Sequence, residues 1–503
     1  MNLRKILAII ILTAIFPWLF YKNLIGLNLP IYNILIIGGL GVVGKVNLQT
    51  VSSKIIIAGT IISAIMVVLN GSILAIAMNI ISLALLAGVS LFPRSTSLLF
   101  VGINSLINFF YSQFSFFELL GEITSGSQIS LNVKRFIRIF ILPVLVVILF
   151  MVIYKAANPV FEGVIKSFFD IIDQFYDFIL EYLEMSLLFT TIFGLILANY
   201  FFLGKALPDL TEYEGKLSFN LSDKYQSEDT KRKERDEVEY RSAIVLFSLL
   251  NILILIINII DINWVWFGFE WEGQYLKQFV HEGTYLLILS IIISLAISIF
   301  YFRGRLNFLS SNKPLRWLAY VWLLQNAILT ISVGIRNYWY INYFSLAYLR
   351  IGVIFFLILT LFSIYTVCVK IRKKKSTYYL ISVNSLATYI ILVAMALFNW
   401  DTIIAKYNFS HSKTAFIHYN FLSELSDNAL PYLYKDMEEL NQYGVDQEKV
   451  FSYKGNYMSI HEYHMKIDSR TKEFIKKWPE RNIWEWTYAG ERSYRKMKSR
   501  KLD

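Results

Sequence analysis

Long apolar runs dominate the pattern along this chain, and short polar stretches separate them. A helix needs about 20 residues to cross the hydrocarbon core of a bilayer. Runs of this length with few charges are typical of transmembrane helices rather than of a soluble core. We therefore predict an all-α, polytopic transmembrane bundle of about 11–12 spans, at residues 5–21, 55–69, 72–92, 97–117, 136–154, 185–204, 242–260, 283–302, 316–334, 347–369 and 378–398.

A further apolar piece, residues 31–43, is short and rich in glycine. It is a weaker candidate for a transmembrane span, because small residues suit a re-entrant segment or a helix packed closely against its neighbours. We favour eleven crossings, with this piece not crossing. That choice places Lys45 and Lys54 on the outer side.

Three segments break the apolar pattern. In residues 158–184, acidic residues recur every three or four positions and apolar residues fill the other face, which predicts an amphipathic helix lying on the membrane surface. Residues 205–241 are mixed in charge and predict a cytoplasmic loop. Residues 399–503 carry frequent, balanced charge and predict a small, mostly helical extramembrane domain, with a frayed basic end. The remaining chain divides into amino-terminal spans, 1–130, and a main bundle, 131–398.

Basic residues indicate the orientation. They gather in 134–138, 231–235, 303–316 and 370–375, which fall on one side when the spans are counted. Lys and Arg mark the cytoplasmic side of a membrane protein. We predict a cytoplasmic amino terminus, with no cleavage after the first span, and a carboxy-terminal domain outside.

Composition narrows the function classes. The chain is 56% hydrophobic and 17% charged, and its net charge is +11. Because the basic residues lie in loops beside spans, this charge is not a sign of nucleic-acid binding. The single cysteine, Cys368, excludes an intramolecular disulfide and a cysteine metal site. His461 and His464 lack the spacing of a zinc helix, so we expect no metal and no cofactor.

One stretch, residues 334–352, combines two arginines with many aromatic residues and no acid. We predict a short interfacial turn at 335–346, because Trp and Tyr gather where spans meet the headgroups. Arginine at this depth is costly without a partner. Polar residues expected at the same outer ends are Asp261, His281, Glu282, Arg336, Arg350, Asn399 and Asp401.

Two interpretations of this polar cluster stay open. In the first it is a structural clamp: Glu282 pairs with Arg336 or Arg350, and Asn399 to Asp401 bind the short turn. In the second the arginines hold a phosphate or carboxylate. His281 beside Glu282 could serve in acid–base chemistry, but no nucleophile stands at a telling spacing.

Several local patterns together resemble a known family. They are Asn158-Pro159, His281-Glu282-Gly283, Arg350-Ile351-Gly352, Asn399-Trp400-Asp401 and Leu425-Ser426-Asp427. Their order and spacing are similar to those of polytopic bacterial membrane proteins known only as a domain of unknown function. The resemblance spans about residues 130–435 and implies a bacterial cytoplasmic (inner) membrane protein. It implies no reaction.

We expect a structural, sensory or accessory component of the membrane, and the absence of a catalytic constellation favours a protein that is not an enzyme. The alternative is a transporter or modifier of an amphiphilic, anionic, lipid-like substrate that uses Arg336 and Arg350. The expected partners are the lipid bilayer and either another membrane protein or a second copy of this chain.

Overall fold

The computed structural model describes residues 2–46, 50–92, 94–123, 184–221, 230–267, 273–309, 312–450 and 458–500, with a few single positions between 147 and 164. Within these ranges the chain is almost entirely helical, and its only β-type pairing is an isolated bridge between Asn220 and Lys375. The predicted all-α class is confirmed. The span expected at 136–154 and the surface helix expected at 158–184 lie outside the described residues.

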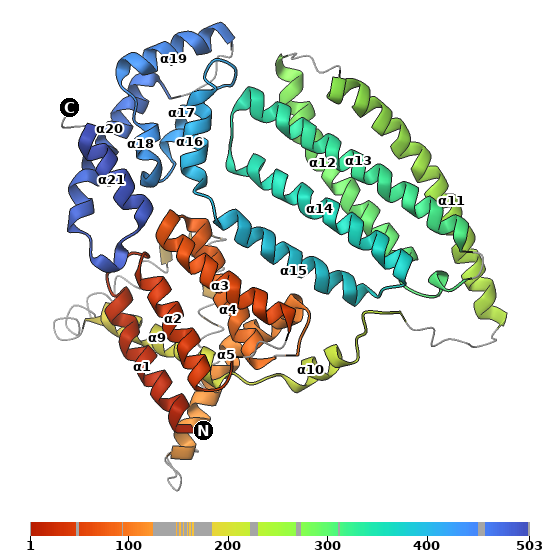
Figure 1. Cartoon of the computed structure of the whole chain (residues 1–503), viewed down its shortest axis with the longest axis horizontal. Coiled ribbons are helices and arrows are strands. Elements are labelled where there is room, and N and C mark those ends of the chain that lie inside the picture. The colour runs from red at the N-terminus through yellow and green to blue at the C-terminus, as the bar shows by residue number, and fades with distance from the viewer. Residues whose placement is uncertain are drawn as a thin grey trace.

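The helices form two groups that α15 joins (Figure 1). The first group contains α1 (Asn2–Phe20), α2 (Asn28–Val42), α3 (Val51–Asn70), α4 (Ile73–Leu91), α5 (Leu98–Ile123) and α9 (Met185–Leu203). The second contains α11 (Thr230–Asp261), α12 (Gly273–Tyr301), α13 (Lys313–Phe344), α14 (Tyr348–Lys373) and α15 (Thr377–Ala396). Helix α15 contacts α14 on one side and α3, α4 and α5 on the other.

Among the described residues, six further α-helices follow the last long apolar one. They are α16 (Trp400–Ser410), α17 (Tyr419–Ser423), α18 (Leu430–Leu433), α19 (Met437–Val450), α20 (Ile460–Lys477) and α21 (Tyr488–Arg500), which we call the C-terminal helices. Their apolar core is continuous with Ile341, Leu346 and Ile351 of α13 and α14. They are therefore packed onto the ends of the long helices rather than tethered to them.

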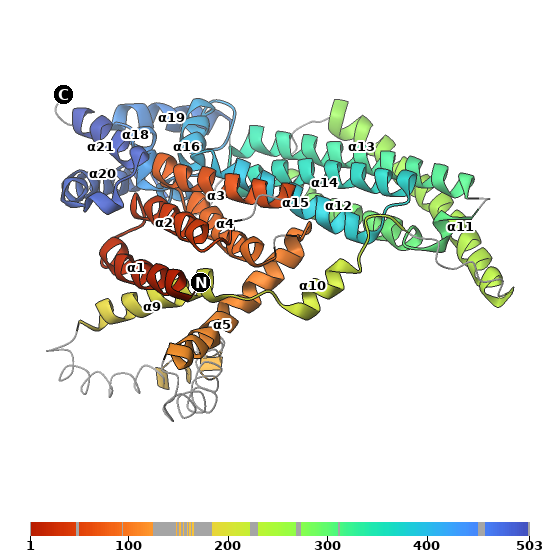
Figure 2. The ribbon, with the colours of Figure 1, turned by 60° about the horizontal axis from the view of Figure 1, so that its bottom comes forward.

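Eight described helices are long and apolar enough to cross a membrane. They contain Leu3–Phe20, Val51–Asn70, Ile73–Leu91, Met185–Leu203, Glu234–Phe267, Lys313–Phe344, Tyr348–Lys373 and Thr377–Ala396. Asn28–Val42 and Tyr285–Tyr301 are shorter apolar helices. The protein is a multi-pass integral membrane protein. The span expected at 97–117 is helical, but α5 runs obliquely away from its neighbours (Figure 2).

The long helices run between two ends of the bundle. α1, α3, α13 and α15 end beside the C-terminal helices, and we call this the capped end (Figure 1). Here the Trp18 ring contacts that of Trp484 at 4.6 Å. Gly71, at φ 55°, ends α3 and Ser72 caps α4, so the chain reverses within a few residues. We call the opposite end, where α14 ends in Lys370, Arg372 and Lys373, the basic end.

Helix α2 runs from the capped end to the basic end, but its 15 residues place it among the shorter apolar helices, so the expectation that residues 31–43 do not cross stays a prediction. At its start Asn28 donates to the Leu19 carbonyl at 3.2 Å, and beyond its end Lys45 donates to the Phe202 carbonyl at 3.1 Å. A Cβ at Gly39 would lie 2.6 Å from the Phe202 ring, so the glycine permits close packing against α9. Lys45 thus lies at the basic end of the bundle.

Three segments differ from expectation. Helix α13 continues to Phe344, so residues 335–344 are helix and the turn is shorter. Residues 205–241 are partly helical, because α10 (Pro208–Gly215) and the start of α11 lie within them. The basic C-terminal segment, which we expected to be frayed, is helical through Arg500, because α21 packs Met497 into the core of the C-terminal helices.

The course of α2 can be tested by thiol labelling. In a Cys368→Ser background, Lys54→Cys and Lys373→Cys should react with a membrane-impermeant maleimide from the same side. Glu438→Cys, on α19, should react from the other side of the membrane, because an odd number of membrane crossings lies between Lys373 and Glu438. Labelling of Lys54→Cys together with Glu438→Cys would mean that α2 does not cross.

Candidate functional site

The capped end gathers most of the polar residues expected to act together. Asp261 ends α11 and Arg336 lies on the facing side of α13, with an Arg336 Nη2 to Asp261 Oδ1 distance of 2.5 Å. Ser332, one turn before Arg336, donates to the other carboxylate oxygen at 2.6 Å. The side chains of Arg336 and Asp261 are 6% and 5% exposed. The pair thus buries two opposite charges that would be expensive alone.

Arg350 stabilises the turn between α13 and α14. Ser345 has φ 67° and ψ 179°, a conformation that is costly for any residue other than glycine. Arg350 donates to the carbonyls of Phe344 and Ser345, and its guanidinium lies 4.3 Å from the centre of the Tyr340 ring. These contacts cover carbonyls that the end of α13 leaves without helical partners.

The C-terminal helices bind the same turn through backbone and amide groups. The buried Asn408 of α16 accepts from the Leu346 N–H at 2.8 Å and donates to the Leu346 carbonyl at 3.1 Å. Ser345 donates to the Phe416 carbonyl at 2.8 Å, and Phe416 donates to the Tyr343 carbonyl at 2.8 Å. A turn this strongly held can keep the strained conformation of Ser345.

We expected Asn399 to Asp401 to bind the short turn. Asn399 and Asp401 instead bind other parts of the capped end. Asn399 caps α16 by accepting from Thr402, and it donates to the Asn70 carbonyl at 3.1 Å. Asp401 accepts from the Tyr348 hydroxyl at 2.5 Å and from the Ser426 N–H at 3.1 Å. These contacts connect the C-terminal helices to α3 and to the start of α14.

His281 and Glu282 fall within α12, but their side chains lie outside the described part of the structure. Their expected pairing with the arginines therefore stays a prediction. His418 is half-buried and caps α17 by accepting from the Phe421 N–H at 3.1 Å. Burial, helped by the positive charge of Arg350, lowers the pKa of His418, which favours the neutral ring that this bond needs.

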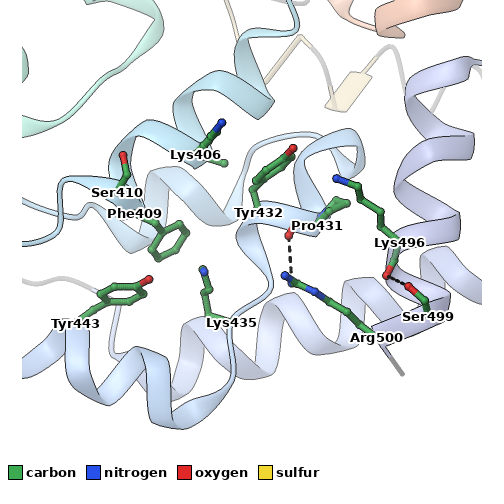
Figure 3. A pocket seen from close by; sticks show the side chains of 11 residues that line it. Lys406, Phe409, Ser410, Pro431, Tyr432, Lys435, Tyr443, Lys496, Ser499 and Arg500 are labelled. Carbon is green, nitrogen blue, oxygen red and sulfur yellow. Dashed lines mark hydrogen bonds between the residues drawn. The ribbon is translucent and has the colours of Figure 1, made fainter. Parts of the chain in front are cut away.

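A second feature of the capped end is not predicted by the sequence. A cavity of about 480 Å³ lies among the C-terminal helices, and Lys406, Lys435, Lys496 and Arg500 line it (Figure 3). No carboxylate belongs to its described lining. Lys406 and Lys435 stand alone in the sequence, so no local motif marks them. The only sequence signal is the i, i+4 spacing of Lys496 and Arg500, which places both on one helix face.

Among the described residues, no group of three or more His, Cys, Asp or Glu side chains is placed to hold a metal ion. Residues 53–435 match the family described as Domain of unknown function (DUF4153). The chain belongs to this family. The match begins well before residue 130, where the resemblance in the sequence began. No curated protein matches the chain, and no solved structure matches it.

The DUF4153 match includes the turn between α13 and α14, the Asp261–Arg336 pair and Asn408. It ends at residue 435, so α19, α20 and α21 lie beyond it. The cationic cavity therefore combines Lys406 and Lys435 from the matched region with Lys496 and Arg500 from outside it.

The buried ion pair should be important for stability. Arg336→Gln and Asp261→Asn should each lower the free energy of unfolding by about 3–5 kcal/mol, because each leaves one buried charge without its partner. The double variant should lose less than the sum of the two. The measurement is unfolding of the detergent-solubilised protein. Arg241→Gln, which breaks an exposed pair with Glu237, is the control and should cost at most about 0.5 kcal/mol. Equal losses in the free energy of unfolding on breaking the Arg336–Asp261 pair and the Arg241–Glu237 pair would contradict the prediction.

The amide clamp gives a second test. Asn408→Leu leaves the buried N–H and carbonyl of Leu346 without partners, at about 1–3 kcal/mol each. Limited proteolysis should then cleave between the long helices and the C-terminal helices faster than in the wild type. Asn441→Leu, an exposed position on α19, should leave the cleavage rate unchanged. Unchanged cleavage in Asn408→Leu would show that the clamp does not hold the two parts together.

Proposed function

We propose that this DUF4153 protein is a non-enzymatic sensory or accessory component of the bacterial cytoplasmic membrane. In this proposal residues 399–503 form an extramembrane domain that is rigidly coupled to the membrane helices. The observation that carries it is the attachment of the C-terminal helices to two separate helix junctions. They bind the α13–α14 junction at Leu346 and Tyr348, and the α3–α4 junction at Asn70.

Rigid attachment supports a sensory or accessory role because a force or ligand acting on the C-terminal helices reaches both groups of long helices. The bonds at Asn70 lie in the first group and those at Leu346 in the second. A flexibly linked domain would bind a partner without affecting the helices. A domain fixed at several points makes binding and helix packing thermodynamically linked.

The orientation is part of the proposal. The basic end carries Lys54, Arg303 and the cluster that ends α14, and the excess of Lys and Arg supports a cytoplasmic location for that end. The amino terminus then lies in the cytoplasm. The C-terminal helices lie outside the cell membrane, where they meet extracytoplasmic partners.

The alternative function, transport or modification of a lipid-like anion by Arg336 and Arg350, has weaker support. Arg336 is paired with Asp261, and Arg350 donates to the carbonyls of Phe344 and Ser345. An arginine that is committed to a carboxylate or to helix carbonyls has fewer N–H groups for a substrate. The contacts favour the clamp interpretation of these two residues.

Cross-linking in native membranes tests the accessory role. A lysine-reactive cross-linker should yield a discrete adduct between this protein and another membrane protein, or a second copy, at native expression levels. The adduct should weaken at least about threefold in Asn408→Leu, because the loosened C-terminal helices no longer present one surface. Asn441→Leu is the matched control. Absence of any discrete adduct with the wild type would remove the support for an accessory role.

A further inference from the structure

The clamp contacts do not account for the cationic cavity. Its four cations come from three places in the chain: Lys406 from α16, Lys435 from the segment before α19, and Lys496 and Arg500 from α21 (Figure 3). Figure 3 shows Lys496 and Arg500 reaching inward from α21 and Lys435 from the segment opposite, with Lys406 on α16 above them. Cations that line one cavity repel one another, and an anion in that cavity would relieve the repulsion.

Only one of these cations has a carboxylate partner among the described residues. Lys435 lies 3.2 Å from Glu439, and its side chain is 18% exposed. Lys496 lies 5.2 Å over the Tyr432 ring, and Arg500 donates to the carbonyls of Pro431 and Tyr434 at 3.2 and 3.3 Å. Cation–ring and carbonyl contacts orient these groups without neutralising their charge.

The rest of the wall is aromatic and hydroxylic. Phe409, Tyr432 and Tyr443 give it flat surfaces, and Ser410 and Ser499 add hydroxyl groups. Lys435 lies 5.6 Å from the centre of the Phe409 ring and 5.9 Å from that of Tyr443. Such a wall suits an anionic group attached to a polyol or sugar, because rings pack against the carbon face and hydroxyls bind the oxygens.

A smaller cavity of about 220 Å³ adjoins the first and shares Pro431, Tyr432 and Lys496 with it. It is also lined by Leu69 and Asn70, the last residues of α3. The two cavities therefore lead from the end of a membrane helix to the cationic wall. Lys406 is seven positions beyond Asn399, about 10 Å along α16, which is within reach of the headgroup region of a bilayer.

We propose that the cationic cavity binds the phosphate ester headgroup of a membrane amphiphile, such as a glycerol phosphate. Lys406 and Lys496 contact the phosphate oxygens, and Tyr432 packs against the attached polyol. The remainder of the amphiphile leaves through the smaller cavity toward Leu69. This proposal does not depend on the accessory role, since a ligand site and a partner surface are separate properties of the C-terminal helices.

Titration calorimetry on the full-length protein in a neutral detergent tests the site with two probes. One is a short-chain phosphatidylglycerol, and the other is soluble glycerol 1-phosphate. The wild type should bind the lipid, and higher salt should weaken binding. Lys406→Gln/Lys496→Gln should lower the affinity at least about tenfold, because two charge-assisted contacts are lost. Both side chains are exposed, so the variant should fold.

Two matched variants separate site loss from general charge loss. Lys413→Gln/Lys476→Gln removes the same charge from exposed positions outside the cavity and should bind like the wild type. Lys406→Arg/Lys496→Arg keeps the charge and should retain binding within about threefold. Equal losses in the Lys413/Lys476 and Lys406/Lys496 variants would overturn the proposal, as would failure of the wild type to bind either probe.

The two probes distinguish the source of the phosphate ester. Tighter binding of the lipid than of glycerol 1-phosphate supports the membrane amphiphile and the route past Leu69. Equal affinity for the two, lost together in Lys406→Gln/Lys496→Gln, keeps the anion site but assigns it to soluble phosphate esters and overturns the lipid route. Neither result depends on whether a protein cross-link forms.

Discussion

Helix carbonyls without partners inside the helix are the constraint on which this structure depends. The last four carbonyls of each helix need donors from elsewhere, and the hydrocarbon region supplies none. At the basic end, Lys45 donates to the carbonyls of Phe202 and Gly204 at the end of α9, and the buried Lys370 donates to that of Lys375 at 2.8 Å. Lysines here serve as caps for helix ends, and the Lys45 contacts connect segments that are far apart in sequence.

At the capped end, a larger number of side chains donates to such helix carbonyls. Arg350 of α14 binds the carbonyls at the end of α13, while Asn408 and Asn428 of the C-terminal part bind those of Leu346 in the turn and Asn70 at the end of α3. Within the C-terminal helices, Arg470 binds the carbonyls of Ser423 and Leu425. The C-terminal helices are thus not an independent addition. They supply donors that the long helices lack, and in return they gain a core that includes Ile341 and Ile351.

The cations of the capped end are of two kinds. Arg336, Arg350 and Arg470 are held by carboxylates or carbonyls, so their charge is used in holding the fold. Lys406 and Lys496 lie on the wall of a cavity and have no carboxylate partner within the described residues. Charge that the fold does not use is the better guide to a binding site, because it stays available to an anionic ligand.

Part of the site could be predicted from sequence. The cost of an arginine at membrane depth pointed to Arg336 and Arg350, and both are bound by protein groups. The partner of Arg336 was harder to assign, because Asp261 is 75 positions away and several acids were possible. Asn408 and the cavity lysines carry no local pattern, since their roles depend on what other helices bring beside them.

The sequence by itself determined the helical membrane class, because apolar length and the need to satisfy the backbone leave few other structures in a bilayer. It also determined most helix positions, since apolar runs end where polar residues begin. Only the tertiary structure decided that α2 runs from one end to the other, that α13 continues past Arg336, and that α21 is ordered. Those features depend on close contacts between distant segments, such as Gly39 against Phe202 and Met497 in the shared core, and helix periodicity carries no information about such contacts.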